Sequence, residues 1–118
     1  MANLDVINAQ IGAGAALSGA VNIGDKTLVG IAIPANWTTA GLSFQASADG
    51  GTTFGELLDE TATGKSISSI TGGAYTVIAV NPTKWRGIVC LKVRSGTSAS
   101  PVKQAQAVTL QLLTRMVN

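Results

Sequence analysis

The sequence predicts an all-β protein, an antiparallel β-sandwich of jelly-roll type with about eight strands. Apolar and polar residues alternate with the period of a strand, most clearly over residues 42–48, where Leu42 and Phe44 alternate with serine and glutamine. Clusters of glycine, aspartate and threonine or serine, such as residues 49–53, separate the alternating runs at intervals of about 8–12 residues. No stretch has a convincing helical period.

The expected elements follow one another along the chain with a turn signal between neighbours. Residues 1–16 form an N-terminal arm or an edge strand, and residues 17–118 form a single sandwich domain. The run 74–80 is apolar on both faces, which predicts a central strand. The expected strands are short and bounded by turn residues, and they fall within 17–23, 28–33, 42–48, 54–58, 67–70, 74–80, 88–94 and 107–115.

Two segments share one pattern, a strand that runs into Pro-x-x-Trp and is followed by a second strand. The two copies end at Trp37 and Trp85. We expect each indole to close one end of the sandwich, because a wide apolar ring covers core surface near a corner. The residues expected to share the core are Leu42, Phe44, Val77, Leu91, Val93, Val108, Leu110 and Leu112.

The composition is unusually poor in charge for a soluble protein. Of 118 residues, 46% are hydrophobic and 12% are charged, about half the usual charged share. A surface so poor in charge indicates a protein that covers part of itself in an assembly, so we expect a homo-oligomer. The single cysteine, Cys90, makes no internal disulfide and is expected to be a small hydrophobic residue in a strand, not a nucleophile. No membrane span and no signal peptide are expected.

The few charges are separated along the chain. All six acidic residues lie in residues 1–60, and seven of the eight basic residues lie in residues 61–118. Alternation places Lys92 and Arg94 on the outward side of one strand. We expect basic surface on one subunit to face acidic surface on a neighbouring subunit or on a larger shell, against the alternative of a solvated rim. The candidate interface residues are Lys84, Arg86, Lys92, Arg94, Asp49, Glu56, Asp59 and Glu60.

The chain lacks the residues of common catalytic sites. It contains no histidine, which excludes a Ser-His-Asp or Cys-His arrangement and an imidazole metal site. The neighbouring acids Glu56, Asp59 and Glu60 fit a solvated turn better than a glycosidase pair, and with Asp49 their spacing fits no compact calcium loop. We therefore expect no enzyme, no catalytic residue, no cofactor and no metal. The basic residues lack interleaved aromatics, so a nucleic-acid partner is not expected.

The chain resembles small structural proteins of tailed bacteriophages. The resemblance covers LVGIAIPANWTTAGLSFQASADGGTTF at residues 28–54, together with the second Pro-x-x-Trp and the segment LKVRSGTSASPVKQA at 91–105. It implies a virion protein of the capsid-decoration (cement) or head-fibre-base type, made in the host cytoplasm, with a trimer favoured and the major capsid protein or another shell protein as partner. The alternative is a carbohydrate-binding or adhesin-type sandwich, with Trp37 or Trp85 as an exposed stacking platform.

Overall fold

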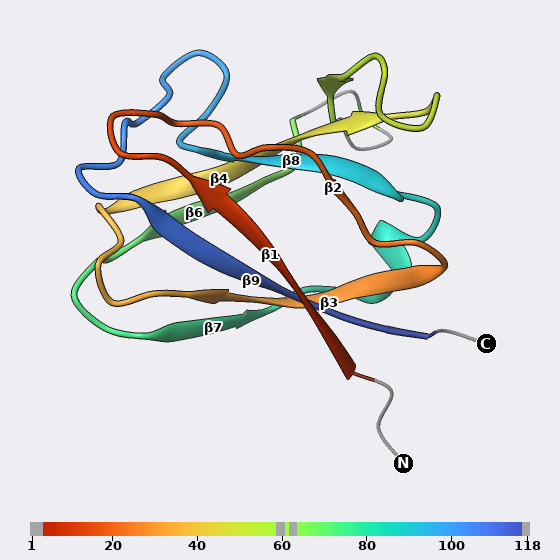
Figure 1. Cartoon of the computed structure of the whole chain (residues 1–118), viewed down its shortest axis with the longest axis horizontal. Helices are drawn as coiled ribbons and strands as arrows, with labels where there is room; N and C mark the ends of the chain where they lie inside the picture. Colours follow the sequence, from red (N-terminus) through yellow and green to blue (C-terminus); the bar gives the residue numbers. More distant parts are fainter. Residues whose placement is uncertain (1–3, 59–60, 62–63, 117–118) are drawn as a thin grey trace.

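The protein is a sandwich of two antiparallel sheets, as the sequence predicts (Figure 1). A computed structural model describes residues 4–58, 61 and 64–116. The first sheet, called sheet A, has the order β1-β9-β3-β7, and the second, sheet B, has the order β2-β8-β4-β5, with β6 also paired to β4. The strands of sheet A are β1 (Leu4–Ile11), β9 (Val108–Met116), β3 (Lys26–Ile33) and β7 (Thr76–Ala79). Those of sheet B are β2 (Val21–Asn22), β8 (Cys90–Ser95), β4 (Ala40–Ser47), β5 (Gly55–Glu56) and β6 (Ser66–Ile70).

The core lies between the sheets and is formed by every second residue of the longer strands. Strand β9 alternates between buried and more exposed positions over its first seven residues, and strand β4 buries Leu42 and Phe44. Seven of the eight predicted core residues are buried. The exception is Val77, whose side chain is 54% exposed, so its predicted place in the core is wrong.

The predicted central position of the run 74–80 is also wrong. Among the described strands, β7 lies at the edge of sheet A and pairs with β3 alone, while β9 occupies a central position between β1 and β3. Ile78 and Val80 pack against the core, whereas Tyr75 and Val77 point away from it. An edge strand with an apolar outer face has the same local pattern as a central strand, which is why periodicity misplaced β7.

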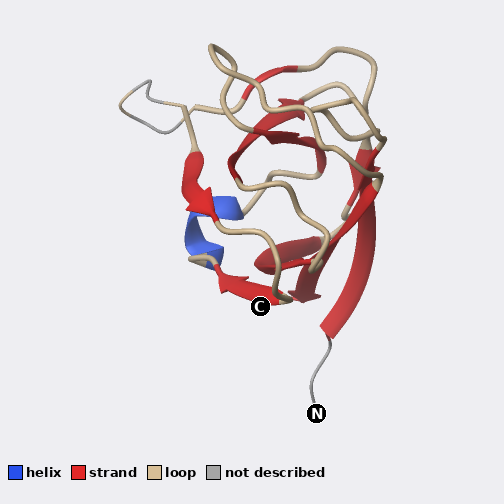
Figure 2. Ribbon diagram, turned by 90° about the vertical axis from the view of Figure 1, so that its left-hand side faces the viewer, coloured by secondary structure: helices blue, strands red, loops and turns tan. Residues whose placement is uncertain are grey.

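Both Pro-x-x-Trp segments place their tryptophan in the core, as predicted. Trp37 is 3% exposed and Trp85 is 4% exposed. The second segment forms a short 3-10 helix, η1 (Pro82–Trp85), drawn in blue in Figure 2, which begins where the Asn81 side chain accepts a hydrogen bond from the Thr83 amide. The Trp85 ring meets Phe44 edge-on, with ring centroids 4.8 Å apart. Neither tryptophan is the exposed stacking platform that the carbohydrate-binding alternative requires.

Of the two alternatives for the N-terminal segment, the structure has the edge strand. Strand β1 pairs with β9 from Leu4 opposite Arg115 to Ile11 opposite Val108, and it buries Ala9 as well as Ile11. The small residues that follow lie along the edge of β8, where the Ser18 amide donates to the Val93 carbonyl over 2.8 Å. The described part of this segment is therefore integral to both sheets. Within the expected strand 17–23, only β2 is regular.

The long loop between β8 and β9 is held by a buried glutamine that the sequence did not reveal. Gln104 is fully buried, and its side-chain carbonyl accepts a hydrogen bond from the Thr38 amide over 2.7 Å. Its side-chain amide donates to the Thr38 carbonyl and to Ser95 Oγ. These bonds join the loop to both the β3–β4 connection and strand β8, so the polar loop is an ordered part of the sandwich end.

Candidate interaction surface

The predicted basic strand is only partly available for contact with another molecule. Lys92 and Arg94 share the outer side of β8, but Arg94 is only 7% exposed. Its guanidinium lies over β4, where Nε donates to Ser43 Oγ over 2.9 Å, and both terminal nitrogens donate to the Glu56 carboxylate. Arg94 thus lies on the outward side of β8, as predicted, but its charge is paired within the chain because β5 brings an acidic partner onto the same side of sheet B.

The Arg94–Glu56 pair neutralises both charges within one chain. The hydrogen bonds from Arg94 hold the pKa of the Glu56 carboxyl below its ordinary value, although partial burial acts in the opposite direction. Gln45 adds a hydrogen bond to the same carboxylate over 3.3 Å. The structure thus brings two predicted interface residues together, but as an internal ion pair on the outer face of sheet B.

The other described candidates are dispersed. Asp49 closes its own turn by accepting hydrogen bonds from Ser47 Oγ and from the Thr52 and Thr53 amides, and these bonds hold its pKa well below the ordinary range. The Lys92 ammonium lies 4.6 Å from the centre of the Phe54 ring. Two further basic candidates, Lys84 and Arg86, are exposed on and just after η1, while Asp59 and Glu60 lie outside the described residues.

A different surface, the outer face of sheet A, has the composition of a contact surface. Strand pairing aligns two rows of outward residues across all four strands. One row is Asn8, Gln111, Ala32 and Val77; the other is Val6, Leu113, Gly30 and Ala79. None of these eight positions carries a charge. A third row of outward residues lies nearer the end of β9 and contains Arg115. The uncharged region therefore ends at this row.

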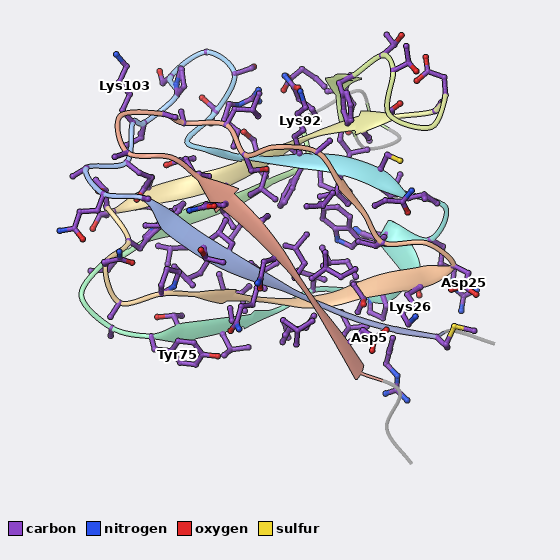
Figure 3. All side chains as sticks on the ribbon, viewed as in Figure 1. Asp5, Asp25, Lys26, Tyr75, Lys92 and Lys103 are labelled. Carbon is purple, nitrogen blue, oxygen red and sulfur yellow. The ribbon has the colours of Figure 1, made fainter. Side chains whose placement is uncertain are left out.

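This outer face is uncharged over these two rows and partly open to solvent, although Ala32 is only 1% exposed. Val6 is 50% exposed, Tyr75 is 63% exposed and Val77 is 54% exposed. Tyr75 lies on the side of β7 that faces away from sheet B, and Lys92 lies on the opposite outer side of the molecule (Figure 3). The Leu113 side chain lies over Gly30, where a Cβ would come within 3.2 Å of Leu113 Cδ1. The sequence indicates apolar residues on both faces of the run 74–80, but its pattern does not show that they join residues of β1, β3 and β9 in one surface.

The described part of the chain contains neither a cluster of metal-ligating side chains nor a membrane-spanning helix. No group of three or more histidine, cysteine, aspartate and glutamate side chains is placed to hold a metal ion among residues 4–58, 61 and 64–116. Within the same residues, no helix is long and apolar enough to cross a membrane.

Comparison with known proteins gives no family. No protein-family model matches the chain, and no curated protein matches it. Among solved structures, the chain is similar to the mitogen derived from Yersinia pseudotuberculosis, with 11% sequence identity and a TM-score of 0.36 over 100% of this chain and 89% of that chain. A likeness at this level carries no argument about function.

Proposed function

We propose that this protein is a non-enzymatic virion structural protein that decorates and stabilises a bacteriophage capsid through contacts between protein surfaces. The observation that carries the proposal is the uncharged outer face of sheet A, which leaves Val6, Tyr75 and Val77 half exposed or more. The centres of protein–protein interfaces are depleted in charge and enriched in tyrosine. The resemblance to small structural proteins of tailed phages supplies the virion as the setting.

The partner of the outer face of sheet A is either a further copy of this chain or the shell protein. A homo-oligomer, with a trimer favoured by the phage resemblance, would bury this face between subunits. The outer face of sheet B, which carries Lys92 and the Arg94–Glu56 pair, would then remain at the polar rim. Because rim charges mainly set association rate while apolar contact supplies affinity, the two faces would have separate roles.

Mass spectrometry of purified phage particles tests the virion assignment. We expect the chain among the particle proteins, at a copy number that is a fixed multiple determined by the capsid symmetry. Absence of the chain from particles that contain all other structural proteins would contradict the assignment, and so would a copy number that varies between preparations.

Charged substitutions on the outer face of sheet A test the surface. The double variant Tyr75→Lys, Val77→Lys should lose self-association or capsid attachment, because burying two unpaired charges in an interface is costly. The matched control, Ala99→Lys with Ser100→Lys, adds the same charge in an exposed loop between β8 and β9 and should associate like the wild type. Circular dichroism on both variants checks that the fold is retained. Equal association of the two variants would exclude this face.

A further inference from the structure

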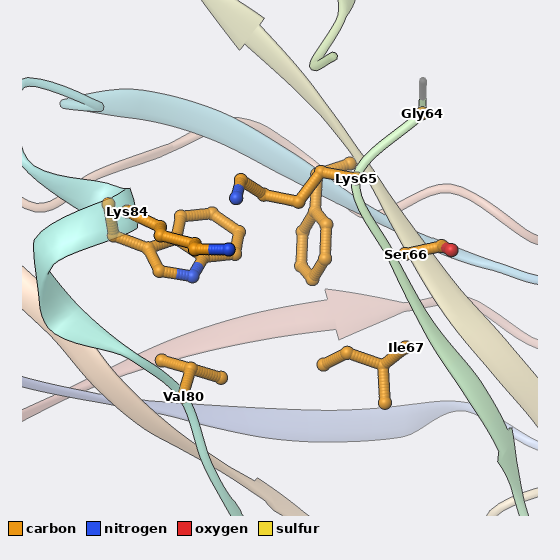
Figure 4. A pocket seen from close by; sticks show the side chains of 8 residues that line it. Gly64, Lys65, Ser66, Ile67, Val80 and Lys84 are labelled. Carbon is orange, nitrogen blue, oxygen red and sulfur yellow. The ribbon is translucent and has the colours of Figure 1, made fainter. Parts of the chain in front are cut away.

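The molecule has a cavity at one side of the sandwich, between the segment that leads into β6 and the segment that joins β7 to η1. Its volume is about 310 Å³, and its apolar walls are Phe44, Ile67, Val80 and Trp85. The lining comes from β4 and β6 of sheet B, from Val80 just after β7 and from η1; Figure 4 labels Ile67 and Val80 on its apolar side. The edge-on pair of Phe44 and Trp85 lies at the buried end of this cavity, where the two residues are only 1% and 4% exposed.

Two lysines line the same cavity from opposite walls. Lys65 is the residue just before β6, and Lys84 belongs to η1. Both side chains extend across the opening (Figure 4). The Lys65 ammonium lies 5.2 Å from the centre of the Trp85 ring. In residues 4–58, 61 and 64–116 the salt bridges are Lys26–Asp5 and Arg94–Glu56, so neither cavity lysine is neutralised by a carboxylate there. The cavity therefore combines apolar walls with two lysines that have no carboxylate partner among the described residues.

We infer that this cavity binds a small organic anion, an aromatic or aliphatic body that carries one carboxylate or sulfonate. The apolar body would pack against Ile67 and Val80, which are only partly buried, and the anionic group would accept hydrogen bonds from the two ammonium groups. The volume is at the lower end of the range for small-molecule sites, which favours a free small molecule over a helix or strand of another protein. The site is distinct from the outer face of sheet A and does not depend on the capsid role.

Titration with 2-naphthoate, followed by amide shifts in nuclear magnetic resonance spectra, tests the site. We expect saturable shifts confined to residues 64–67 and 80–85 around the cavity. The neutral analogue 2-naphthalenemethanol has the same aromatic body and should bind at least about tenfold more weakly, because it cannot form charge-assisted bonds with the lysines. Equal binding of the two compounds, shifts that map elsewhere, or no shift at millimolar naphthoate would overturn the inference.

A pair of double variants separates the cavity lysines from general positive charge. Lys65→Gln with Lys84→Gln should weaken naphthoate binding about tenfold, equivalent to about 1.4 kcal/mol. The control Lys92→Gln with Lys103→Gln removes the same charge from outside the cavity and should change affinity less than twofold. Both variants alter solvent-accessible side chains, so folding should survive, which thermal melting checks. Equal weakening in the two variants would show that the anion responds to net charge and not to this cavity.

Discussion

Arg94 lies on the outer side of a strand and is nevertheless almost inaccessible to water, so its charge depends on internal partners. Burying a guanidinium without partners would cost several kcal/mol. Here Ser43 and the Glu56 carboxylate accept its hydrogen bonds, while the Glu56 side chain stays 38% exposed. The buried Arg94 charge therefore needs its partner more than the Glu56 charge does, because Glu56 remains partly hydrated.

Replacing Glu56 by glutamine should lower the free energy of unfolding by about 1–2 kcal/mol at pH 7, because it leaves the buried Arg94 charge without a counter-charge. The pKa of Glu56 is lowered in the folded state, so its contribution is complete at neutral pH. That contribution falls as the pH drops below the pKa of an unfolded glutamate, about 4.3. Urea denaturation at pH values from 7 to 3 should show that the difference in unfolding free energy between the wild type and Glu56→Gln becomes smaller as the pH falls.

Asp5→Asn supplies the control for this measurement. Asp5 pairs with Lys26 over 2.9 Å, but its side chain is 56% exposed, so the loss should stay below about 1 kcal/mol. A wild-type advantage over the Glu56 variant that is the same at pH 3 and pH 7 would show that the carboxylate charge contributes nothing to stability.

Replacing Phe44 by alanine should cost about 3–5 kcal/mol, the range for a fully buried aromatic side chain. Phe44 is 1% exposed and loses its edge-on contact with Trp85 in this variant. Val77→Ala, on the open outer face of sheet A, should cost within about 0.5 kcal/mol. Chemical denaturation of the two variants measures both values, and a loss below 1 kcal/mol for Phe44→Ala would remove this residue from the core.

Among the elements, the tight turn that follows β8 depends on one glycine. Gly96 has a φ of +88°, and a Cβ there would lie 2.5 Å from the Ser100 carbonyl oxygen. Gly73 has a φ of +99° with no atom within 4 Å of such a Cβ, so it isolates the backbone cost alone. Gly73→Ala should cost about 1–2 kcal/mol, and Gly96→Ala should cost at least about 1 kcal/mol more. Equal losses in denaturation experiments would show that the turn relaxes without strain.

The strands were largely predictable because alternation reports which side chains share a face. The core positions of β4, β8 and β9 follow directly from this rule. Alternation does not report the order of strands in a sheet, and for that reason β7 was placed at the centre. Alternation also does not report which neighbouring strand covers an outward side chain. It therefore does not predict that Glu56 of β5 pairs with Arg94 and helps to bury it. Gln104 gave no signal, since a polar loop residue becomes buried only through distant partners.

For the whole molecule, the uncharged outer face of sheet A predicts self-association that responds weakly to salt. Contacts between exposed charges weaken as salt screens them, whereas apolar contacts do not. Sedimentation at 50 mM and at 500 mM sodium chloride should therefore give similar or stronger association at the higher concentration. Dissociation at high salt would instead assign the contact to the charged outer face of sheet B and its Lys92 side chain.

The central position of β9 in sheet A has a consequence for synthesis on the ribosome. Strand β9 follows all the other described strands along the chain, yet it joins β1 to β3 in sheet A. Until β9 has emerged, β1 lacks its described partner in sheet A, so Ala9 and Ile11 cannot take their buried places in that sheet. The β3–β7 and β4–β8 pairs can form earlier. Folding of the nascent chain should thus be completed in one late step, with a rate limited by the closure of distant segments.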